Sequence, residues 1–409
     1  MIDANKLLLL ISSTVLLCYI SGIFYSKTKI PDIIWVLGFG IVLGPVLGFF
    51  DKDLFLYISP LMSTVALSVI LFDAGINLDI ALLMKSMLKS TVLSVSTFFS
   101  VMFTVGFTLH YILPESFTVL QGMLLGAMIG GTSTIAVFGI LSGLDKMIKD
   151  IESTKVILMM ESILSDPICI IASITIIRMI MLPGVSIADS LKDIIYTFTL
   201  SSIFGIALGL VWAEALDKLR RRSLSYMMTL SILFPAYIMA ETVIGEGGGP
   251  MAALTFGLSI TNYRYFVKKI DLKRNLKIDK TYLREFHEEI TFLIKAFFFV
   301  YIGLIVNMSV QYMKIGLIIV ALVLAVRYVI ATIVGEFFNF SLQERVLTRL
   351  IFAQGLPAFI MSQLPLIFDP GRQFFLNPEI YPNLCMPIVL GTILFAAILG
   401  PIISKRQLK

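Results

Sequence analysis

The sequence predicts an all-α integral membrane protein with about thirteen transmembrane helices. Hydrophobic residues make up 58% of the 409 residues, whereas charged residues make up only 14%. A soluble protein of this length could not bury so much apolar surface. Apolar runs of about 17–25 residues, a length that crosses a bilayer as a helix, recur along the whole chain. We therefore expect a single membrane domain over residues 1–409 and no soluble domain.

The apolar runs place these helices in order along the chain. We expect them at about 7–25, 32–50, 55–78, 90–113, 117–142, 155–182, 193–215, 223–243, 249–263, 289–308, 314–337, 347–368 and 383–403. The basic segment 264–288 is predicted to be a surface linker. Six spans on each side of one linker helix (about 193–215) indicate a first repeat (about 7–182) and a second repeat (about 223–403). Because the linker crosses the membrane once, the two six-helix repeats must be inverted relative to each other.

Basic residues gather in every second loop and so orient the chain. The loops that follow odd-numbered spans hold most of them, including Lys27, Lys85, Lys146, Arg220, Arg264 and Arg345. Basic loops stay on the cytoplasmic side, which predicts an outside N-terminus and a cytoplasmic C-terminus in the plasma membrane. The net charge is only +5, and we expect no nucleic-acid partner.

Five ionisable residues lie inside the predicted spans: Asp73, Glu161, Asp166, Lys295 and Arg327. A charged side chain within the bilayer costs roughly 2.5–3.5 kcal/mol, so each of the five is a candidate functional residue. Three acids and two bases leave one carboxylate without a fixed cation. Such a carboxylate binds either a proton or a mobile cation, which is the minimum requirement for a proton/cation exchanger.

Helical geometry gives the two acids of span 155–182 different roles. Glu161 and Asp166 point about 140° apart on a regular helix, so they do not share one ion. Pro167 removes an N–H next to Asp166 and can free a carbonyl there. We therefore expect Asp166 to titrate and Glu161 to pair with Arg327, since arginine binds carboxylates through two parallel hydrogen bonds. The alternative is that both acids belong to structural ion pairs.

Asp73 and Lys295 each allow two interpretations. Asp73 either completes an ion site or reaches interfacial water near a helix end. Lys295 is either a buried charge partner near the point where helices cross or a side chain that extends to the membrane surface.

Two spans contain residues that break helices. Gly130 and Gly131 precede the hydroxyl residues Thr132, Ser133 and Thr134 in the fifth span. Gly355 and Pro357 follow Gln354 in the twelfth span, which is the fifth span of the second half. Breaks at corresponding positions of two halves indicate the binding site of a transporter, and the polar side chains there can bind the freed backbone groups. The alternative is close helix packing through small residues.

Several segments in order resemble the NhaP-type sodium/proton antiporters of the cation/proton antiporter superfamily. The stretch Glu161–Pro167 is similar to that family's Glu-Ser-x-x-Asn-Asp-Pro, and Leu71–Leu78 to its third-helix segment, which usually has Glu where this chain has Asp73. The segments Gly247–Gly257, Phe297–Leu304 and Gly355–Ala358 also fit. The resemblance implies a homodimer in which Asp166 exchanges a cation for protons by alternating access, with Glu161 and Arg327 as a structural pair.

The sequence departs from the family at two positions. The family usually has Thr-Asp-Pro where this chain has Thr132-Ser133-Thr134, and Asn where this chain has Ser165. Hydroxyls and carbonyls would then have to cap the broken helix. A site with fewer carboxylates has a weaker field, which would favour K⁺ over Na⁺.

We therefore expect an antiporter that exchanges Na⁺ or Li⁺ for H⁺. The metal ligands would be Asp166 and Asp73, with Ser162, Ser165, Thr132, Ser133 and Thr134 completing the site. Exchange should be electroneutral if only Asp166 titrates, and no cofactor is expected. The alternatives are a K⁺/H⁺ antiporter on the same scaffold, or a membrane sensor or channel-like protein that does not exchange ions. An enzyme is not expected, because His110 and His287 lie away from the acids and no nucleophile–base set appears.

Overall fold

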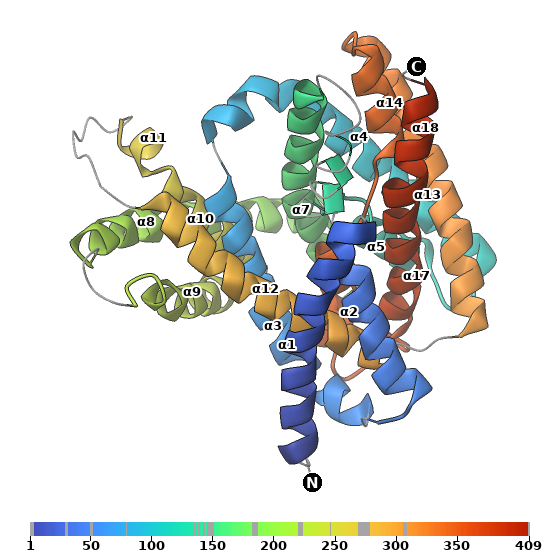
Figure 1. The fold of residues 1–409 in the computed structure, drawn as a ribbon, viewed down its shortest axis with the longest axis horizontal. Helices are drawn as coiled ribbons and strands as arrows, with labels where there is room; N and C mark the ends of the chain where they lie inside the picture. Colours follow the sequence, from blue (N-terminus) through green and yellow to red (C-terminus); the bar gives the residue numbers. More distant parts are fainter. Residues whose placement is uncertain are drawn as a thin grey trace. The chain divides into compact units, whose positions relative to one another are not determined.

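In the computed structural model, α-helices and short π-helical segments, joined by turns and irregular connections, make up the regular structure of the part of the chain that it describes (Figure 1). That part comprises residues 4–28, 32–49, 52–78, 80–133, 136–137, 140–141, 144, 151–181, 187–219, 224–245, 247–268, 279–305 and 309–407. No strand occurs within these ranges, in agreement with the predicted all-α class.

The chain forms two compact units, and three helices contribute residues to both. The first unit comprises Met1–Pro60, Ser86–Pro183 and Ala296–Lys409, and the second comprises Leu61–Lys85 and Gly184–Lys295. The three shared helices are α3 (Lys52–Asn77), α4 (Ile80–Ile112) and α12 (Lys280–Ile305).

The remaining helices of the first unit build the part of the fold that carries the candidate site. They are α1 (Ala4–Thr28), α2 (Asp32–Ile41), η1 (Val42–Val46), α5 (Val119–Met128), α7 (Glu152–Met181), α13 (Val310–Phe337), α14 (Leu342–Leu350), α15 (Leu356–Ser362), α16 (Leu364–Phe368), α17 (Ile380–Leu394), η3 (Phe395–Leu399) and α18 (Gly400–Gln407). Within this unit α7 packs against α5, α14, α15 and α16, and α17 packs against α13 and α15.

The second unit is organised around α10 (Gly248–Thr261). Its other helices are α8 (Ile187–Leu219), α9 (Met228–Met239), η2 (Ala240–Ile244) and α11 (Tyr263–Lys268). Glycines permit the close approach of α8 to α10: a Cβ on Gly205 would lie 2.5 Å from the carbonyl oxygen of Ala252, and one on Gly209 would lie 2.6 Å from that of Phe256. Small residues spaced four apart are a common way for membrane helices to approach.

Within the described residues, five helical stretches are long and apolar enough to cross a membrane. They are Met87–Ile112, Ser153–Met181, Ile195–Leu219, Val310–Phe337 and Ile380–Ser404. Shorter apolar helices occupy most of the other predicted spans: Leu8–Phe24, Ile34–Val46, Thr64–Asn77, Val119–Met128, Met228–Ile244 and Pro357–Phe368. Proline, glycine and helix breaks divide several of these spans, which is why fewer helices reach full length.

The prediction that 264–288 is a surface linker is wrong at both ends. The helix α11 occupies the start of this segment, and α12 begins at Lys280, nine residues before the predicted span. The carboxylate of Asp279 accepts a hydrogen bond from the N–H of Tyr282 (3.1 Å) and so caps the first turn of α12. The polar residues before 289 correctly show that the apolar span begins there. The helix itself begins earlier, because Asp279 caps it at a polar segment.

Asp369 organises the connection between α16 and α17, outside the membrane spans. Its carboxylate accepts hydrogen bonds from the N–H groups of Gln373 (3.0 Å), Phe374 (2.7 Å) and Phe375 (2.8 Å). Burial alone would favour the protonated form, but these three donors outweigh it and hold the pKa of Asp369 below its usual range. The ionised carboxylate therefore stabilises this connection.

We expect Asp369→Asn to lower the apparent melting temperature in detergent at neutral pH. Hydrogen bonds to a charged group are worth about 1.5–3 kcal/mol, and an amide has only one acceptor oxygen. Because the folded-state pKa is depressed, the stabilisation is present above the unfolded-state pKa of about 3.9 and is lost as the pH falls through the folded-state pKa. Melting curves of both proteins over a pH series should therefore converge in acid. A constant difference at every pH would contradict this account.

Candidate functional site

Both predicted helix breaks are present in the first unit. The chain is not helical over 129–133, which follows α5, or over 351–355, which precedes α15. The two breaks are joined directly, because the N–H of Ser133 donates to the carbonyl oxygen of Ala353 (2.7 Å). A Cβ on Gly355 would collide with the side chain of Ser133, so glycine is required at this contact.

The second break differs from the prediction in one detail. Pro357 was expected to interrupt the helix, but it lies in the first turn of α15. Proline is tolerated there because the first N–H groups of a helix have no partner within the helix. The interruption ends at Gly355, immediately before α15 begins.

Gln354 ties the two breaks together. Its side chain is fully buried, and its Nε2 donates to the carbonyl oxygen of Ile129 (2.5 Å), just beyond the end of α5. Its Oε1 accepts a hydrogen bond from Thr392 of α17 (3.3 Å). The amide therefore satisfies a carbonyl that the break leaves without a partner in α5.

Replacing Gln354 by methionine keeps the volume of the side chain but removes its donor. We expect a loss of about 1–3 kcal/mol, the cost of a buried carbonyl without a hydrogen bond, measured as a lower apparent melting temperature in detergent. Thr175→Val of α7 is the control, since among the described residues the hydroxyl of Thr175 bonds only the carbonyl oxygen of Ile171 in its own helix (2.6 Å), and its loss should cost less. Equal losses in the two variants would argue against this role for Gln354.

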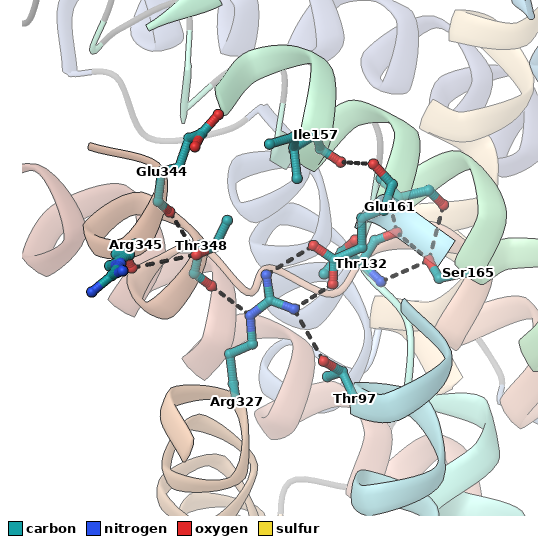
Figure 2. A network of polar contacts seen from close by, with 11 residues as sticks. Thr97, Thr132, Ile157, Glu161, Ser165, Arg327, Glu344, Arg345 and Thr348 are labelled. Atoms are coloured by element: carbon teal, nitrogen blue, oxygen red, sulfur yellow. Dashed lines mark hydrogen bonds and ion pairs between the residues drawn. The ribbon is translucent and has the colours of Figure 1, made fainter. Parts of the chain in front are cut away.

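Hydroxyls of α7 hold the first break. The Oγ of Ser162 donates to the carbonyl oxygen of Thr132 (2.8 Å), and the N–H of Thr132 donates to the Oγ of Ser165 (3.1 Å). Figure 2 shows Thr132 and Ser165 within this network. The Oγ1 of Thr132 is itself buried and has no hydrogen-bond partner among the described residues. The predicted residue Thr134 lies outside the described residues.

Asp166 follows Ser165 directly in α7. Its side chain is half-buried, and among the described residues its carboxylate makes no hydrogen bond and no ion pair. One turn further along α7, Cys169 packs against the first break: a Cβ added to Gly131 would lie only 2.9 Å from the Sγ of Cys169. Asp166 thus lies on the helix that contacts the first break, and it has no fixed cation.

Glu161 has a fixed cation. Arg327 of α13 binds both of its carboxylate oxygens, through Nη1 to Oε1 and through Nη2 to Oε2 (2.8 Å). Both side chains are almost fully buried, at 1% and 0% exposure. The guanidinium also donates to the carbonyl oxygen of Thr348 (2.6 Å) and to the Oγ1 of Thr97 (3.2 Å), as Figure 2 shows. The pairing expected from the sequence is present, and it neutralises Glu161.

Sequence reasoning did not identify two threonines whose hydroxyls contact the site residues: Thr97, which accepts from Arg327, and Thr392, which donates to Gln354. Each lies in or beside an apolar helix, where a threonine can equally bond the carbonyl of its own preceding turn. An isolated threonine in a span therefore gives no signal of a distant partner.

Asp73 and Lys295 belong to the second unit and pair with each other there. The Nζ of Lys295 lies 3.7 Å from Oδ2 of Asp73, and both side chains are largely buried. The Nδ2 of Asn77 donates to Oδ1 of Asp73 (3.2 Å). Of the two interpretations of Lys295, the structure favours a charge partner, and that partner is Asp73.

Residues 12–408 of the chain match the family described as "Sodium/hydrogen exchanger, transmembrane". The chain belongs to this family. As an exchanger-family member it is a multi-pass membrane protein, and these exchangers are transporters rather than enzymes, as the sequence predicted.

Individual relatives agree with this family. The "Na(+)/H(+) antiporter 1" of Methanocaldococcus jannaschii is 24% identical over 289 residues, which cover 69% of this chain but only 65% of that relative, less than two thirds of its length. A structure of the sodium proton antiporter MjNhaP1 from M. jannaschii at pH 8 matches with a TM-score of 0.74 and 18% identity, covering 98% of this chain and 97% of that one. An electron-microscopy structure of MjNhaP1 matches with a TM-score of 0.74 and 20% identity, covering 100% and 98%. The predicted relationship to the NhaP-type antiporters and the predicted all-helical membrane fold are confirmed.

Proposed function

We propose that this exchanger-family protein exchanges a monovalent cation for protons by alternating access, with Asp166 as the exchanging carboxylate. One observation carries the proposal: of the two acids of α7, Glu161 is bound on both oxygens by Arg327, whereas Asp166 has no ion pair among the described residues. A carboxylate in a membrane helix without a fixed cation must bind a proton or a mobile cation. Competition between these two at Asp166 is the exchange step.

Na⁺ or Li⁺ is the proposed cargo, because hard monovalent cations bind carboxylate, hydroxyl and carbonyl oxygens. Asp166 would supply the charge. Ser162 and Ser165 lie on the same helix, and the Oγ1 of Thr132 is buried without a partner among the described residues, so it remains available as a ligand. Ser133 and Thr134 are proposed to contribute oxygens as well.

Asp73 is proposed as a further ligand of the cation, although it already forms an ion pair with Lys295. Its carboxylate lies 3.7 Å from Lys295, so Asp73 would bind the cation only while it is released from that lysine. Asp73→Asn should therefore weaken cation binding without removing proton exchange at Asp166.

K⁺ is the second candidate cargo. At the first break, the groups that meet α7 are hydroxyls and backbone carbonyls, with Thr132 and Ser133 next to the glycines and no acid between them. A site with a single carboxylate has a weaker field and dehydrates a large cation more readily than a small one. This observation favours K⁺ and makes the ion the first property to test.

The test uses purified protein in proteoliposomes with an imposed pH gradient that a pH-sensitive dye reports. Na⁺, Li⁺ and K⁺ are added in turn. Collapse of the gradient by Na⁺ or Li⁺ supports the first cargo, and collapse by K⁺ alone supports the second. No collapse with any of the three ions would contradict antiport and leave a protein that does not exchange ions.

Electroneutrality follows from a single titrating carboxylate, because one proton leaves for each monovalent cation that binds. A transport current that depends on the added cation would contradict this stoichiometry. We propose in addition that the protein is a homodimer in the plasma membrane with its N-terminus outside, as the resemblance and the distribution of basic loops imply. Cross-linking in native membranes and labelling from either side test these two statements.

A further inference from the structure

A polar cavity lies at the end of the second unit where α10 finishes and α12 begins. Its volume is about 320 Å³, within the range of about 300–1,000 Å³ typical of small-molecule sites. The polar residues that line it are Thr261, Tyr263, Arg264, Asp279, Lys280 and Thr281. The three exchange features of the first unit (the two breaks and Asp166) are not part of it, so it calls for a separate explanation.

The cavity carries an excess of positive charge. Arg264 and Lys280 both line it, and Arg264 makes no ion pair or hydrogen bond with the described residues. Asp279 is the acid in the lining, but its Oδ1 already accepts the N–H of Tyr282 at the start of α12 (3.1 Å). An anionic group in the cavity would therefore meet the cations Arg264 and Lys280, while Asp279 caps a helix and Glu214 accepts the hydroxyl of Tyr263 (3.0 Å).

The sequence of this part of the chain is basic as well. Residues 264–284 contain eight lysines and arginines but only two aspartates. Basic clusters of this size immediately next to a membrane helix attract anionic lipids. The sequence therefore favours an anionic lipid as a partner of this part of the chain.

The cavity also lies at the level where a membrane helix ends. Its lining includes the last residues of α10, a predicted membrane span that finishes at Thr261, and the next residues form the short helix α11, with Tyr263 buried and Tyr265 exposed at 38%. Aromatic residues that flank a membrane helix in this way are typical of the headgroup region. The anionic group that this region supplies in the greatest amount is the phosphate of a lipid headgroup.

We propose that this cavity binds the phosphate group of an anionic phospholipid, with Arg264 and Lys280 as its cationic contacts. The site is independent of the exchange step at Asp166. It would couple the stability of the second unit to the lipid composition of the membrane, since a ligand that binds only the folded state stabilises it.

The experiment measures binding of phosphatidylglycerol to the full-length protein in detergent, by native mass spectrometry and by the rise in apparent melting temperature. Arg264→Gln/Lys280→Gln is the test variant, and Lys192→Gln/Lys314→Gln removes the same charge elsewhere. Each removed cation near a membrane surface should weaken binding about fivefold, so the test variant should bind about thirtyfold more weakly. Arg264→Gln alone should lose about fivefold, which gives a second reading if the double variant folds poorly.

Selective binding of phosphatidylglycerol over phosphatidylcholine, lost in the test variant and kept in the control, would support the site. Equal binding in the test variant and the wild type would overturn it. A separate arm replaces the lipid with glycerol 3-phosphate at the same phosphate concentration. An equal rise in melting temperature with this soluble ligand would overturn the lipid assignment in favour of a soluble phosphate compound.

Discussion

Replacing Asp166 by asparagine is expected to abolish cation/proton exchange while leaving the yield of folded protein unchanged. Asparagine has nearly the same size and shape, but it neither titrates nor supplies a negative charge. In the structure Asp166 makes no ion pair or hydrogen bond among the described residues, so the change removes no contact on which folding depends. Gradient collapse in proteoliposomes should fall to the level of empty liposomes.

The control for this prediction is another acid on a membrane helix. Glu336 is exposed near the end of α13, and Glu336→Gln removes the same charge without touching the site. It should exchange at the wild-type rate. Residual exchange in Asp166→Asn, with the same ion selectivity as the wild type, would move the exchanging group to a different residue.

Replacing Glu161 by glutamine is expected to destabilise the protein strongly. Breaking a buried ion pair by removing one partner costs about 3–5 kcal/mol, because the remaining charge stays buried without compensation. Here that charge is Arg327, which is fully buried and would keep only uncharged partners: the amide oxygen of the new glutamine, the carbonyl oxygen of Thr348 and the hydroxyl of Thr97. The apparent melting temperature should fall by more than in Asp369→Asn or in the Gln354→Met variant.

A double variant separates a structural role of this pair from a role in exchange. Glu161→Gln/Arg327→Met removes both charges and should recover much of the lost stability, since replacing a buried ion pair by apolar groups is often neutral. Protein of the double variant that folds but does not exchange would show that Glu161 takes part in exchange, against the division of roles between Glu161 and Asp166.

The sequence predicted those contacts for which a membrane interior offers few possible partners. A buried arginine must find a carboxylate, so the pairing of Glu161 with Arg327 could be expected before any coordinates existed. The glycines also marked the breaks for a reason that packing explains: a Cβ on Gly355 would collide with Ser133 of the other break, and one on Gly131 would crowd Cys169 and Ser165 of α7.

The structure added what depends on long-range packing. The contact between Gln354 and Ile129 joins residues far apart in the sequence, and no local pattern specifies that pairing. The start of α12 was missed because hydropathy reports where a helix leaves the bilayer rather than where it ends. The inverted relation of the two repeats remains a prediction.

The first helix break has a consequence for backbone dynamics. An interrupted helix leaves some backbone amides without a partner in the helix. A backbone amide that makes no hydrogen bond exchanges its hydrogen with solvent rapidly. Here the N–H groups of Thr132 and Ser133 are both donors, to Ser165 and to Ala353. Hydrogen–deuterium exchange at these two amides should therefore be as slow as in the middle of an intact helix, so that the interrupted segment is a rigid element of the proposed exchange site.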